Sequence, residues 1–175
     1  DNLKSCFADF NPDIVINLAA QAGVRYSLIN PSSYLDSNIL YFLHILNLSE
    51  VFEVERFIYA SSSSVYGDEK KIPFSENFEN LNPSSLYGKT KLANEIIAHN
   101  NKNLKTIGLR FFTVFGPWGR PDMAYYSFTK NIKEENKIKV FNQGSMKRDM
   151  TYITDIVDGI ESSIFFKTEN QSEIF

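Results

Sequence analysis

The sequence lacks the features that mark secreted, membrane-spanning and nucleic-acid-binding proteins. Its 175 residues include one cysteine, Cys6, so no disulfide can form within the chain, which fits a reducing compartment. No apolar run approaches the roughly 20 residues that a membrane-spanning helix needs. The net charge is −3 with both signs interspersed, which argues against a nucleic-acid footprint. We therefore expect a cytoplasmic protein with no nucleic-acid or membrane partner.

A glycine-rich turn is also missing. No Gly-x-Gly-x-x-Gly segment joins a strand to a helix, although this turn holds the pyrophosphate in many dinucleotide-binding proteins. The chain begins in a stretch typical of a loop or helix and stops without a clear terminal element. We interpret it as the central part of a longer protein, without that protein's first strands.

Enough apolar material is present for a buried core, because 43% of the residues are hydrophobic and there are 15 Phe and 9 Tyr. Apolar runs predict buried strands over 13–20, 56–60 and 106–112. Apolar residues at helical spacing follow Pro31, and a further helix is predicted over 87–99. Alternation of strands and helices predicts an α/β protein with a parallel sheet and right-handed crossovers.

The pattern changes after residue 115, at the turn-forming Gly-Pro-Trp-Gly-Arg-Pro segment 116–121. Beyond it we predict a mixed-charge helix over 125–136, a short strand over 137–141 and a final helix over 154–166. The sequence therefore predicts two regions, 1–115 and 116–175, with a helix of the second returning to the first.

A tyrosine and a lysine, Tyr87 and Lys91, stand four positions apart on the predicted helix 87–99. Four residues advance about 6 Å along a helix and return to nearly the same face, so both side chains can point into one site. The ammonium of Lys91 would lower the pKa of Tyr87, whose phenol otherwise keeps its proton to about pH 10. Such a tyrosine can act as a general base near neutrality. The same spacing is also typical of an ordinary pair on a helix surface.

Four consecutive serines, Ser61 to Ser64, follow the predicted strand 56–60. Open α/β sheets bind ligands beyond the carboxyl ends of their strands. Hydroxyls at that edge can hydrogen-bond an alcohol or a developing carbonyl oxygen. A polar loop is the plainer alternative, and the neighbouring Tyr87 and Lys91 favour a site.

Taken in order, the motifs resemble those of the extended short-chain dehydrogenase/reductase family, and within it the nucleotide-sugar epimerases, in particular UDP-glucuronate 4-epimerases. They are Asn-Leu-Ala-Ala-Gln-Ala-Gly-Val-Arg at 17–25, Ser-Ser-Ser-Ser-Val-Tyr-Gly at 61–67, Tyr-Gly-Lys-Thr-Lys at 87–91, Leu-Arg-Phe-Phe-Thr-Val-Phe-Gly-Pro-Trp-Gly-Arg-Pro-Asp-Met-Ala at 109–124 and Arg-Asp-Met-Thr-Tyr-Ile at 148–153. The resemblance covers nearly the whole chain. It implies a doubly wound, Rossmann-type parallel sheet, here incomplete, that binds NAD, with part of a smaller substrate-binding domain after residue 115.

The resemblance also implies the reaction, which is 4-epimerisation of a UDP-sugar, from UDP-glucuronate to UDP-galacturonate. Tyr87 would take the proton of the C4 hydroxyl while C4 gives a hydride to NAD. Lys91 would lower the pKa of Tyr87 and bind the nicotinamide ribose, and Ser62 would contact the same sugar oxygen. The 4-keto sugar would then turn and take the hydride back on its other face.

Further contacts are implied residue by residue. The implied NAD contacts are Leu18, Ala19, Ala20, Gln21, Asn38, Ala60, Ser61, Tyr87, Lys91 and Phe111. The implied substrate contacts are Ser62, Ser63, Ser64, Thr113, Phe141, Asn142 and Arg148, the last of which would grip the diphosphate with its planar donor fork. Arg25 and Arg120 could each meet the sugar carboxylate or form a structural salt bridge. No metal ligand set is implied.

Several alternatives stay open. The substrate could instead be UDP-glucose or UDP-N-acetylglucosamine. Family members that dehydrate or decarboxylate the keto sugar carry an acid in the segment aligned with 62–64, where this chain has only hydroxyls, which favours epimerisation. A non-enzymatic NAD-binding scaffold is a further alternative, and the retained Tyr87, Lys91 and Ser62 favour an enzyme.

Two expectations concern assembly and competence. Relatives pair through helices that correspond to 31–51 and 85–101, so we expect a homodimer. Because the glycine-rich turn is missing, we expect these 175 residues alone to bind NAD weakly and to turn over little substrate.

Overall fold

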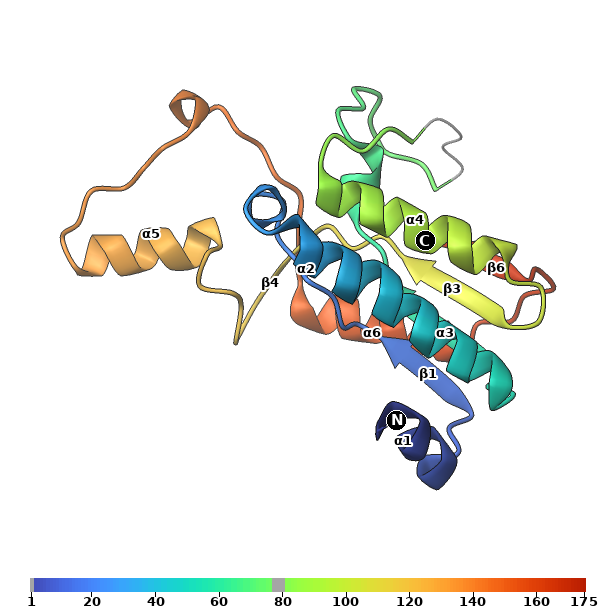
Figure 1. Cartoon of the computed structure of the whole chain (residues 1–175). Coiled ribbons are helices and arrows are strands. Elements are labelled where there is room, and N and C mark those ends of the chain that lie inside the picture. Colours follow the sequence, from blue (N-terminus) through green and yellow to red (C-terminus); the bar gives the residue numbers. More distant parts are fainter. Residues whose placement is uncertain (1, 77–80) are drawn as a thin grey trace. The chain divides into compact units, whose positions relative to one another are not determined.

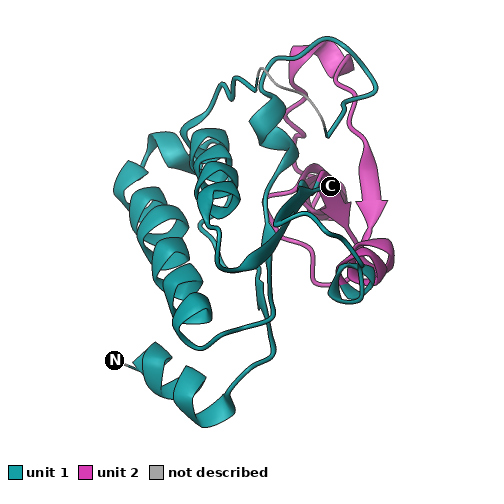
Figure 2. Cartoon of the chain, turned by 90° about the vertical axis from the view of Figure 1, so that its right-hand side faces the viewer, with its two compact units in different colours: residues 1–111, 161–175 teal, residues 112–160 magenta. Residues whose placement is uncertain are grey.

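The computed structural model describes residues 2–76 and 81–175 (Figure 1). The chain forms two compact units. Unit 1 comprises Asp1–Phe111 and Glu161–Phe175, and unit 2 comprises Phe112–Ile160 (Figure 2). The units change over at residue 111, and the chain returns to unit 1 within its last long helix. The predicted boundary between residues 115 and 116, which concerns domains with separate tasks, stays a prediction.

Unit 1 contains a four-stranded parallel sheet in the order β1-β2-β3-β6. The strands are β1 (Ile14–Asn17), β2 (Arg56–Ala60), β3 (Lys105–Leu109) and β6 (Ser172–Ile174). The predicted α/β class with a parallel sheet is confirmed. Strand β6 corrects the expectation that the chain stops without a terminal element. Three residues are too few to show a period, and pairing with β3 is what makes them a strand.

The helices of unit 1 start where the sequence provides caps. Helix α1 (Asn2–Phe10) precedes β1. Helix α2 (Pro31–Leu35) has Pro31 in its first turn, and the Asn30 side chain accepts a hydrogen bond from the amide of Ser33. Helix α2 continues through a π-helical turn, η2 (Asp36–Leu40), into α3 (Tyr41–Val51).

Helix α4 (Leu86–Asn100) begins after Ser85, whose Oγ accepts from the amide of Gly88 at 3.0 Å. Two short 3-10 turns are η1 (Tyr26–Leu28) and η3 (Ser63–Tyr66).

The core of unit 1 lies between β2 and the helices. The aromatic rings of Phe57 and Tyr59, on β2, pack edge-on against Phe42 of α3 at centroid distances of 5.6 and 5.3 Å. Leu46 of α3 and Ala98 of α4 complete this contact. Each large apolar side chain buried in this way contributes about 1.5–3 kcal/mol relative to an exposed one. The core therefore fixes α3 and α4 against the sheet, and α4 carries both Tyr87 and Lys91.

Unit 2 has little regular structure. Strand β4 (Thr113–Phe115) pairs in parallel with β5 (Met150–Tyr152), and between them lie α5 (Ala124–Lys133) and the short η4 (Asn142–Gly144). Helix α6 (Ile153–Ile164) begins in unit 2 and ends in unit 1. The strand predicted over 137–141 is wrong: its alternating apolar residues have no partner strand within the described chain, and an unpaired strand satisfies no backbone ladder.

Two negative findings hold for residues 2–76 and 81–175. Within these ranges, every helix is too short or too polar to cross a membrane. The same ranges hold no group of three His, Cys, Asp or Glu side chains that could bind a metal ion.

Candidate active site

The ammonium of Lys91 is held at the carboxyl end of β2. Lys91 is 4% exposed, and its Nζ donates a hydrogen bond of 2.7 Å to the carbonyl oxygen of Ala60, the last residue of the strand. Burial lowers the pKa of Lys91 to about 8, because water no longer solvates the charged form. The structure therefore brings the lysine of the predicted pair to the sheet edge at which the serines begin.

Tyr87 lies one turn before Lys91 on α4 and is half-buried. Its ring meets that of Tyr34 edge-on, with centroids 6.2 Å apart and planes at 77°. Tyr34 is fully buried, and its hydroxyl donates to the backbone carbonyls of Ala22 and Gly23, in the segment after β1. Tyr87 is thus packed against a ring that is itself anchored to this segment. Its role as a general base stays a prediction.

The serine segment after β2 is held by its backbone. The amide of Ser61 donates to the carbonyl of Leu109 at 2.8 Å, and the amide of Ser63 donates to that of Phe111 at 2.9 Å. Ser62 caps η3, because its Oγ accepts from the amide of Ser64 at 3.1 Å. Since that hydroxyl oxygen already accepts a hydrogen bond, its own proton is left to be donated. This is the polarity that a contact to a sugar oxygen needs.

Gly88 explains why helix α4 can approach these serines so closely. A Cβ at this position would lie 2.6 Å from the carbonyl oxygen of Ser64 and 2.8 Å from the Cβ of Pro83. Real Cβ atoms do not approach backbone oxygens to this distance. The glycine between Tyr87 and Lys91 is therefore required by the contact between α4 and the serine segment.

Asn38 occupies the π-helical turn η2 and links two of the predicted motifs, 17–25 and 87–91. Its Nδ2 donates to the carbonyl of Gln21 at 3.1 Å and to Oγ1 of Thr90 at 3.0 Å, while its Oδ1 accepts from the amide of Gln21 at 2.8 Å. Thr90 in turn donates to the carbonyl of Tyr87 at 2.8 Å. Asn38 is 1% exposed. The structure thus gives it a role in fixing the segment after β1 to helix α4, and its contact with NAD stays a prediction.

A pocket of about 360 Å³ opens at the carboxyl end of β1. This volume is at the lower end of the range in which proteins bind small molecules. The pocket is lined by Leu3, Asn17, Ala19, Ala20, Gln21, Ser37, Tyr41, Phe42 and Ile45, so it includes three predicted NAD contacts. Small alanine side chains and an adjacent buried amide group, that of Asn17, suit one end of a dinucleotide. The residues present therefore fit part of NAD, and the pocket adds Ser37 and Tyr41 to the candidates.

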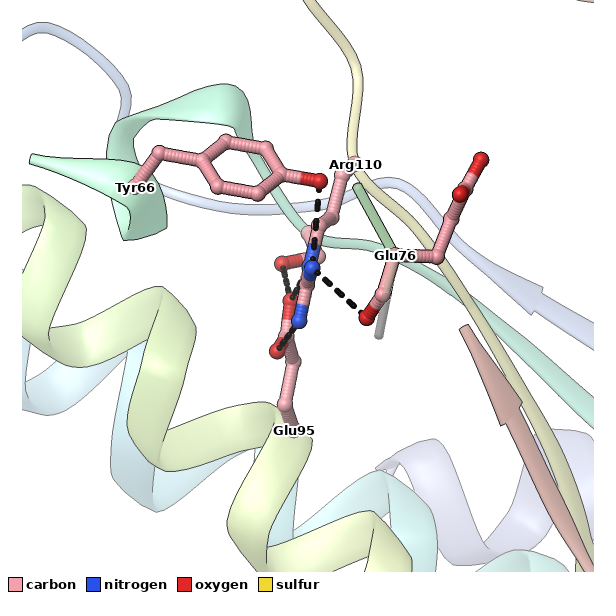
Figure 3. Close-up of polar contacts among 5 residues, drawn as sticks. Tyr66, Glu76, Glu95 and Arg110 are labelled. Atoms are coloured by element: carbon pink, nitrogen blue, oxygen red, sulfur yellow. Dashed lines mark hydrogen bonds and ion pairs between the residues drawn. The ribbon is translucent and has the colours of Figure 1, made fainter. Parts of the chain in front are cut away.

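The main feature that the sequence analysis missed is a buried ion pair beside the serines (Figure 3). Arg110 donates from Nε and Nη2 to the two carboxylate oxygens of Glu95, at 2.9 Å each. Its Nη1 donates to the hydroxyl of Tyr66 at 3.1 Å and to the carbonyl of Glu76 at 3.3 Å. Burial alone would lower the pKa of Arg110, but the hydrogen bonds to Glu95 and Tyr66 outweigh it and raise that pKa.

A signal for this pair existed in the sequence. Glu95 follows Lys91 by four residues, so the two share a face of α4, and Arg110 interrupts an apolar strand. Charged residues are almost never fully buried without a partner. An arginine in a predicted buried strand therefore indicates a nearby carboxylate, although it does not say which one.

The remaining predicted residues fall into two groups. In unit 1, Leu18 and Arg25 are exposed, and Ala60, Ser64 and Phe111 are half-buried. In unit 2, Thr113 is half-buried, while Arg120, Phe141, Asn142 and Arg148 are exposed. Their predicted contacts with the substrate stay predictions.

Of the two alternatives left open for Arg120, the structure contains the salt bridge. Arg120 donates to both carboxylate oxygens of Asp122, at 2.9 and 2.5 Å. These hydrogen bonds lower the pKa of Asp122.

Comparison with known proteins gives a consistent result. Protein CapI of Staphylococcus aureus is 54% identical over 163 residues, which are 91% of this chain and 49% of that protein. UDP-glucuronate 4-epimerase 4 of Arabidopsis thaliana is 52% identical over 152 residues, or 83% of this chain and 35% of that enzyme. The structure of UDP-glucuronic acid 4-epimerase from Bacillus cereus, in complex with UDP-glucuronic acid and NAD, matches with a TM-score of 0.91 at 35% identity, over 100% of this chain and 56% of the other.

These matches confirm the resemblance drawn from the motifs. The chain spans only about a third to a half of the length of the curated relatives quoted above. Residues 1–169 match the NAD dependent epimerase/dehydratase family over nearly the whole sequence. The chain, with its parallel sheet and its serine, tyrosine and lysine motifs, therefore belongs to the NAD-dependent epimerase/dehydratase family.

Proposed function

We propose that this protein epimerises a UDP-sugar at C4 with bound NAD, and that its substrate is UDP-glucuronate, giving UDP-galacturonate. The observation that carries the proposal is the hydrogen bond from Lys91 to Ala60, which puts a cation at the start of the serine segment and one turn from Tyr87. Similarity to UDP-glucuronate 4-epimerases over most of the chain supports the choice of substrate.

The residues of the chain have distinct tasks in this reaction. When bound, NAD supplies the acceptor and later the donor of the C4 hydride. Tyr87 takes the proton of the C4 hydroxyl and returns it after the sugar has turned. The ammonium of Lys91 favours the phenolate form of Tyr87. Ser62, whose Oγ accepts from the amide of Ser64, donates a hydrogen bond to the C4 oxygen and keeps its own proton.

Epimerisation is favoured over dehydration or decarboxylation by the acids near the site. Residues 62–64 offer only hydroxyls. The carboxylate that does approach this segment, Glu95, is buried and accepts hydrogen bonds from Ser61 and Arg110. A carboxylate committed in this way is a poor base for taking a proton from carbon. The keto sugar would therefore be left intact for the return of the hydride.

The test is product analysis by NMR after the full-length protein has been incubated with NAD and a panel of UDP-sugars. We expect UDP-galacturonate from UDP-glucuronate, with no net reduction of NAD. Tyr87→Phe should reduce turnover by about 10²- to 10⁴-fold, the usual contribution of a general base. Tyr126→Phe, on helix α5, is the matched control and should keep turnover within about twofold. Release of CO2 as the main outcome, or indifference to Tyr87→Phe, would refute the proposal.

We also infer that the protein forms a homodimer through the surface of α2, η2, α3 and α4. Large apolar side chains on these elements are at least half exposed: Leu35, Leu40, Val51 and Ile96. Large apolar side chains exposed on neighbouring helices suit an interface between subunits. Sedimentation of the full-length protein should give a dimer mass, and Leu40→Lys should shift it towards the monomer. A monomer at micromolar concentration would contradict this inference.

A further inference from the structure

Helix α4 forms side-chain hydrogen bonds with two successive residues at the end of β2 and the start of the serine segment, Ala60 and Ser61. Lys91 donates to the carbonyl of Ala60, and one turn later the carboxylate of Glu95 accepts a hydrogen bond from the hydroxyl of Ser61. Ser61 is 2% exposed, and its hydroxyl donates its hydrogen bond to Glu95 inside the protein. The residue that precedes Ser62 is therefore tied to the helix that carries Tyr87.

Arg110 donates to the same carboxylate of Glu95 that accepts from Ser61. It lies between Leu109 and Phe111, whose carbonyls accept from the amides of Ser61 and Ser63. Its guanidinium donates a hydrogen bond to each carboxylate oxygen of Glu95 and another to the hydroxyl of Tyr66, the last residue of η3 (Figure 3). Its Cζ also lies 5.0 Å from the centroid of the Tyr66 ring. One side chain thus links both ends of the segment 61–66 to helix α4.

We propose that the buried Glu95–Arg110 pair is a positioning element that acts through Ser61, and that it sets the distance between Ser62 and the Tyr87–Lys91 turn. This inference rests on the proposed function, because it assigns the pair to the reaction performed at that site. Neither Glu95 nor Arg110 touches the substrate. Both oxygens of Glu95 are used by Arg110, and one of them also by Ser61, so the carboxylate is committed to this cluster.

The physical reason lies in where rigidity is needed. The side chain of Ser62 has a local contact with the amide of Ser64, and the backbone on either side of it is hydrogen-bonded to Leu109 and Phe111 rather than to helix α4. The hydroxyl of Ser61 donates directly to a side chain of α4 and so ties the end of the segment next to Ser62 to that helix. Since misplacing a reacting group by about 1 Å can cost up to 10²-fold in rate, loss of this link should lower kcat without removing any group that contacts substrate.

The main test is Ser61→Ala in the full-length protein, which deletes one hydroxyl and leaves Glu95 paired with Arg110. We expect kcat with UDP-glucuronate to fall about 10- to 100-fold, with KM and the affinity for NADH, measured by fluorescence titration, within about twofold of the wild type. If Glu95 acts through Ser61, Glu95→Gln should lower kcat in the wild type but add less than about threefold in the Ser61→Ala background. Fully multiplicative losses would overturn the proposal, as would a kcat of Ser61→Ala within twofold of the wild type. A loss of NADH affinity would instead make Ser61 a cofactor contact and would also overturn it.

The matched control is Glu50→Gln on helix α3. Glu50 also accepts two side-chain hydrogen bonds, from Asn101 and Asn103, but lies outside the serine segment. If reduced stability alone lowered kcat, this variant would show the same loss; we expect its kcat to stay within about twofold.

Hydrogen exchange separates failure of this inference from failure of the proposed function, because it needs no substrate. In Glu95→Gln, the amides of residues 61–66 should exchange at least about tenfold faster, while those of β2 remain protected. Unchanged exchange would overturn the positioning role. Faster exchange in a protein that epimerises no UDP-sugar would refute the proposed function alone and leave the structural link intact.

Discussion

Two arginine–carboxylate pairs in this protein have the same geometry and opposite surroundings. Arg110 and Glu95, in unit 1, form two parallel hydrogen bonds with side chains that are 5% and 7% exposed. Arg120 and Asp122, in unit 2, form the same fork with side chains that are 48% and 62% exposed. The first pair joins a helix to a strand end, and the second spans two residues of one turn. Two pairs with equal hydrogen bonds can thus differ in their effect on stability, because burial decides whether water can solvate the charge that remains when one partner is removed.

The difference extends to the units that contain the pairs. Unit 1 holds every buried apolar side chain found among the described residues, with Phe57, Ile58 and Tyr59 of β2 fully enclosed. Unit 2, all of which is described, has no buried side chain. A unit without a buried core gains little free energy from the burial of apolar surface, and its internal contacts are exposed to water. We therefore expect substitutions in unit 1 to change stability far more than those in unit 2.

The largest expected effect is that of Arg110→Met. This change leaves the carboxylate of Glu95 buried without its cation, which should cost about 3–5 kcal/mol of unfolding free energy. Urea unfolding at pH 7 measures it. The double variant Glu95→Leu with Arg110→Met should recover much of the loss, because two apolar side chains leave no unpaired charge. If Arg110→Met loses less than about 1 kcal/mol of unfolding free energy, the buried pair contributes no more than an exposed one, which would contradict this prediction.

The next effect concerns pH. The pKa of Lys91 is about 8 in the folded state, against 10.5 for an unperturbed lysine side chain, so the unfolded chain binds more protons between these limits. Unfolding free energy should therefore rise with pH across this window, by up to about 3 kcal/mol in total. Lys91→Met should abolish that rise. Urea unfolding at pH 7.5, 9 and 10 checks it, with Lys89→Met as the control, since Lys89 is exposed on the same helix. A control that flattens the pH curve as strongly would contradict the assignment to Lys91.

The same titration predicts a pH dependence of catalysis. Above about pH 8 Lys91 loses its charge, and the proposed reaction then lacks the cation that we assign to favouring the phenolate of Tyr87. We expect kcat/KM to decline on the alkaline side, with an apparent pKa near 8. A profile that stays flat to pH 10 would separate Lys91 from the reaction.

Two glycines give a smaller and more direct comparison of the units. Gly88→Ala should cost about 1–3 kcal/mol, because the new methyl group would meet the carbonyl of Ser64. Gly159→Ala, on helix α6 in unit 2, meets nothing within 4 Å and should stabilise by up to about 1 kcal/mol through helix propensity. Thermal unfolding of both variants measures the difference in sign. Two shifts of the same sign would show that close packing at Gly88 is not what distinguishes these sites.

The smallest expected effect is that of Arg120→Gln. An exposed pair contributes about 0–1 kcal/mol, and salt screens it further. The difference from the wild type should fall towards zero when urea unfolding is repeated in 0.5 M NaCl, which shortens the screening length to about 4 Å. A loss as large as that of Arg110→Met would mean that unit 2 buries this pair in the full-length protein.

Features set by residues close together in the sequence were predicted better than features that depend on distant partners. Strand β2 was predicted at its observed bounds, and α4 within one residue at each end, because apolar runs and the Ser85 cap act over a few residues. The strand predicted over 137–141 failed, since a strand needs a partner that no local pattern specifies. For the same reason, the approach of Lys91 to the start of the serine segment was predicted, whereas the contact of Glu95 with Arg110 was not, and the roles of these residues in a reaction stay predictions.

The sequence by itself determined the alternation of strands and helices and the spacing that puts Tyr87 and Lys91 on one face of a helix. These follow from backbone geometry, which repeats every two residues in a strand and every 3.6 residues in a helix. Only the tertiary structure decided which carboxylate meets Arg110, and that Asn38 binds both Gln21 and Thr90, which lie 17 and 52 residues away from it. Such partners depend on how separate elements pack together, and the free energy of burying their polar groups is set by all the neighbours at once.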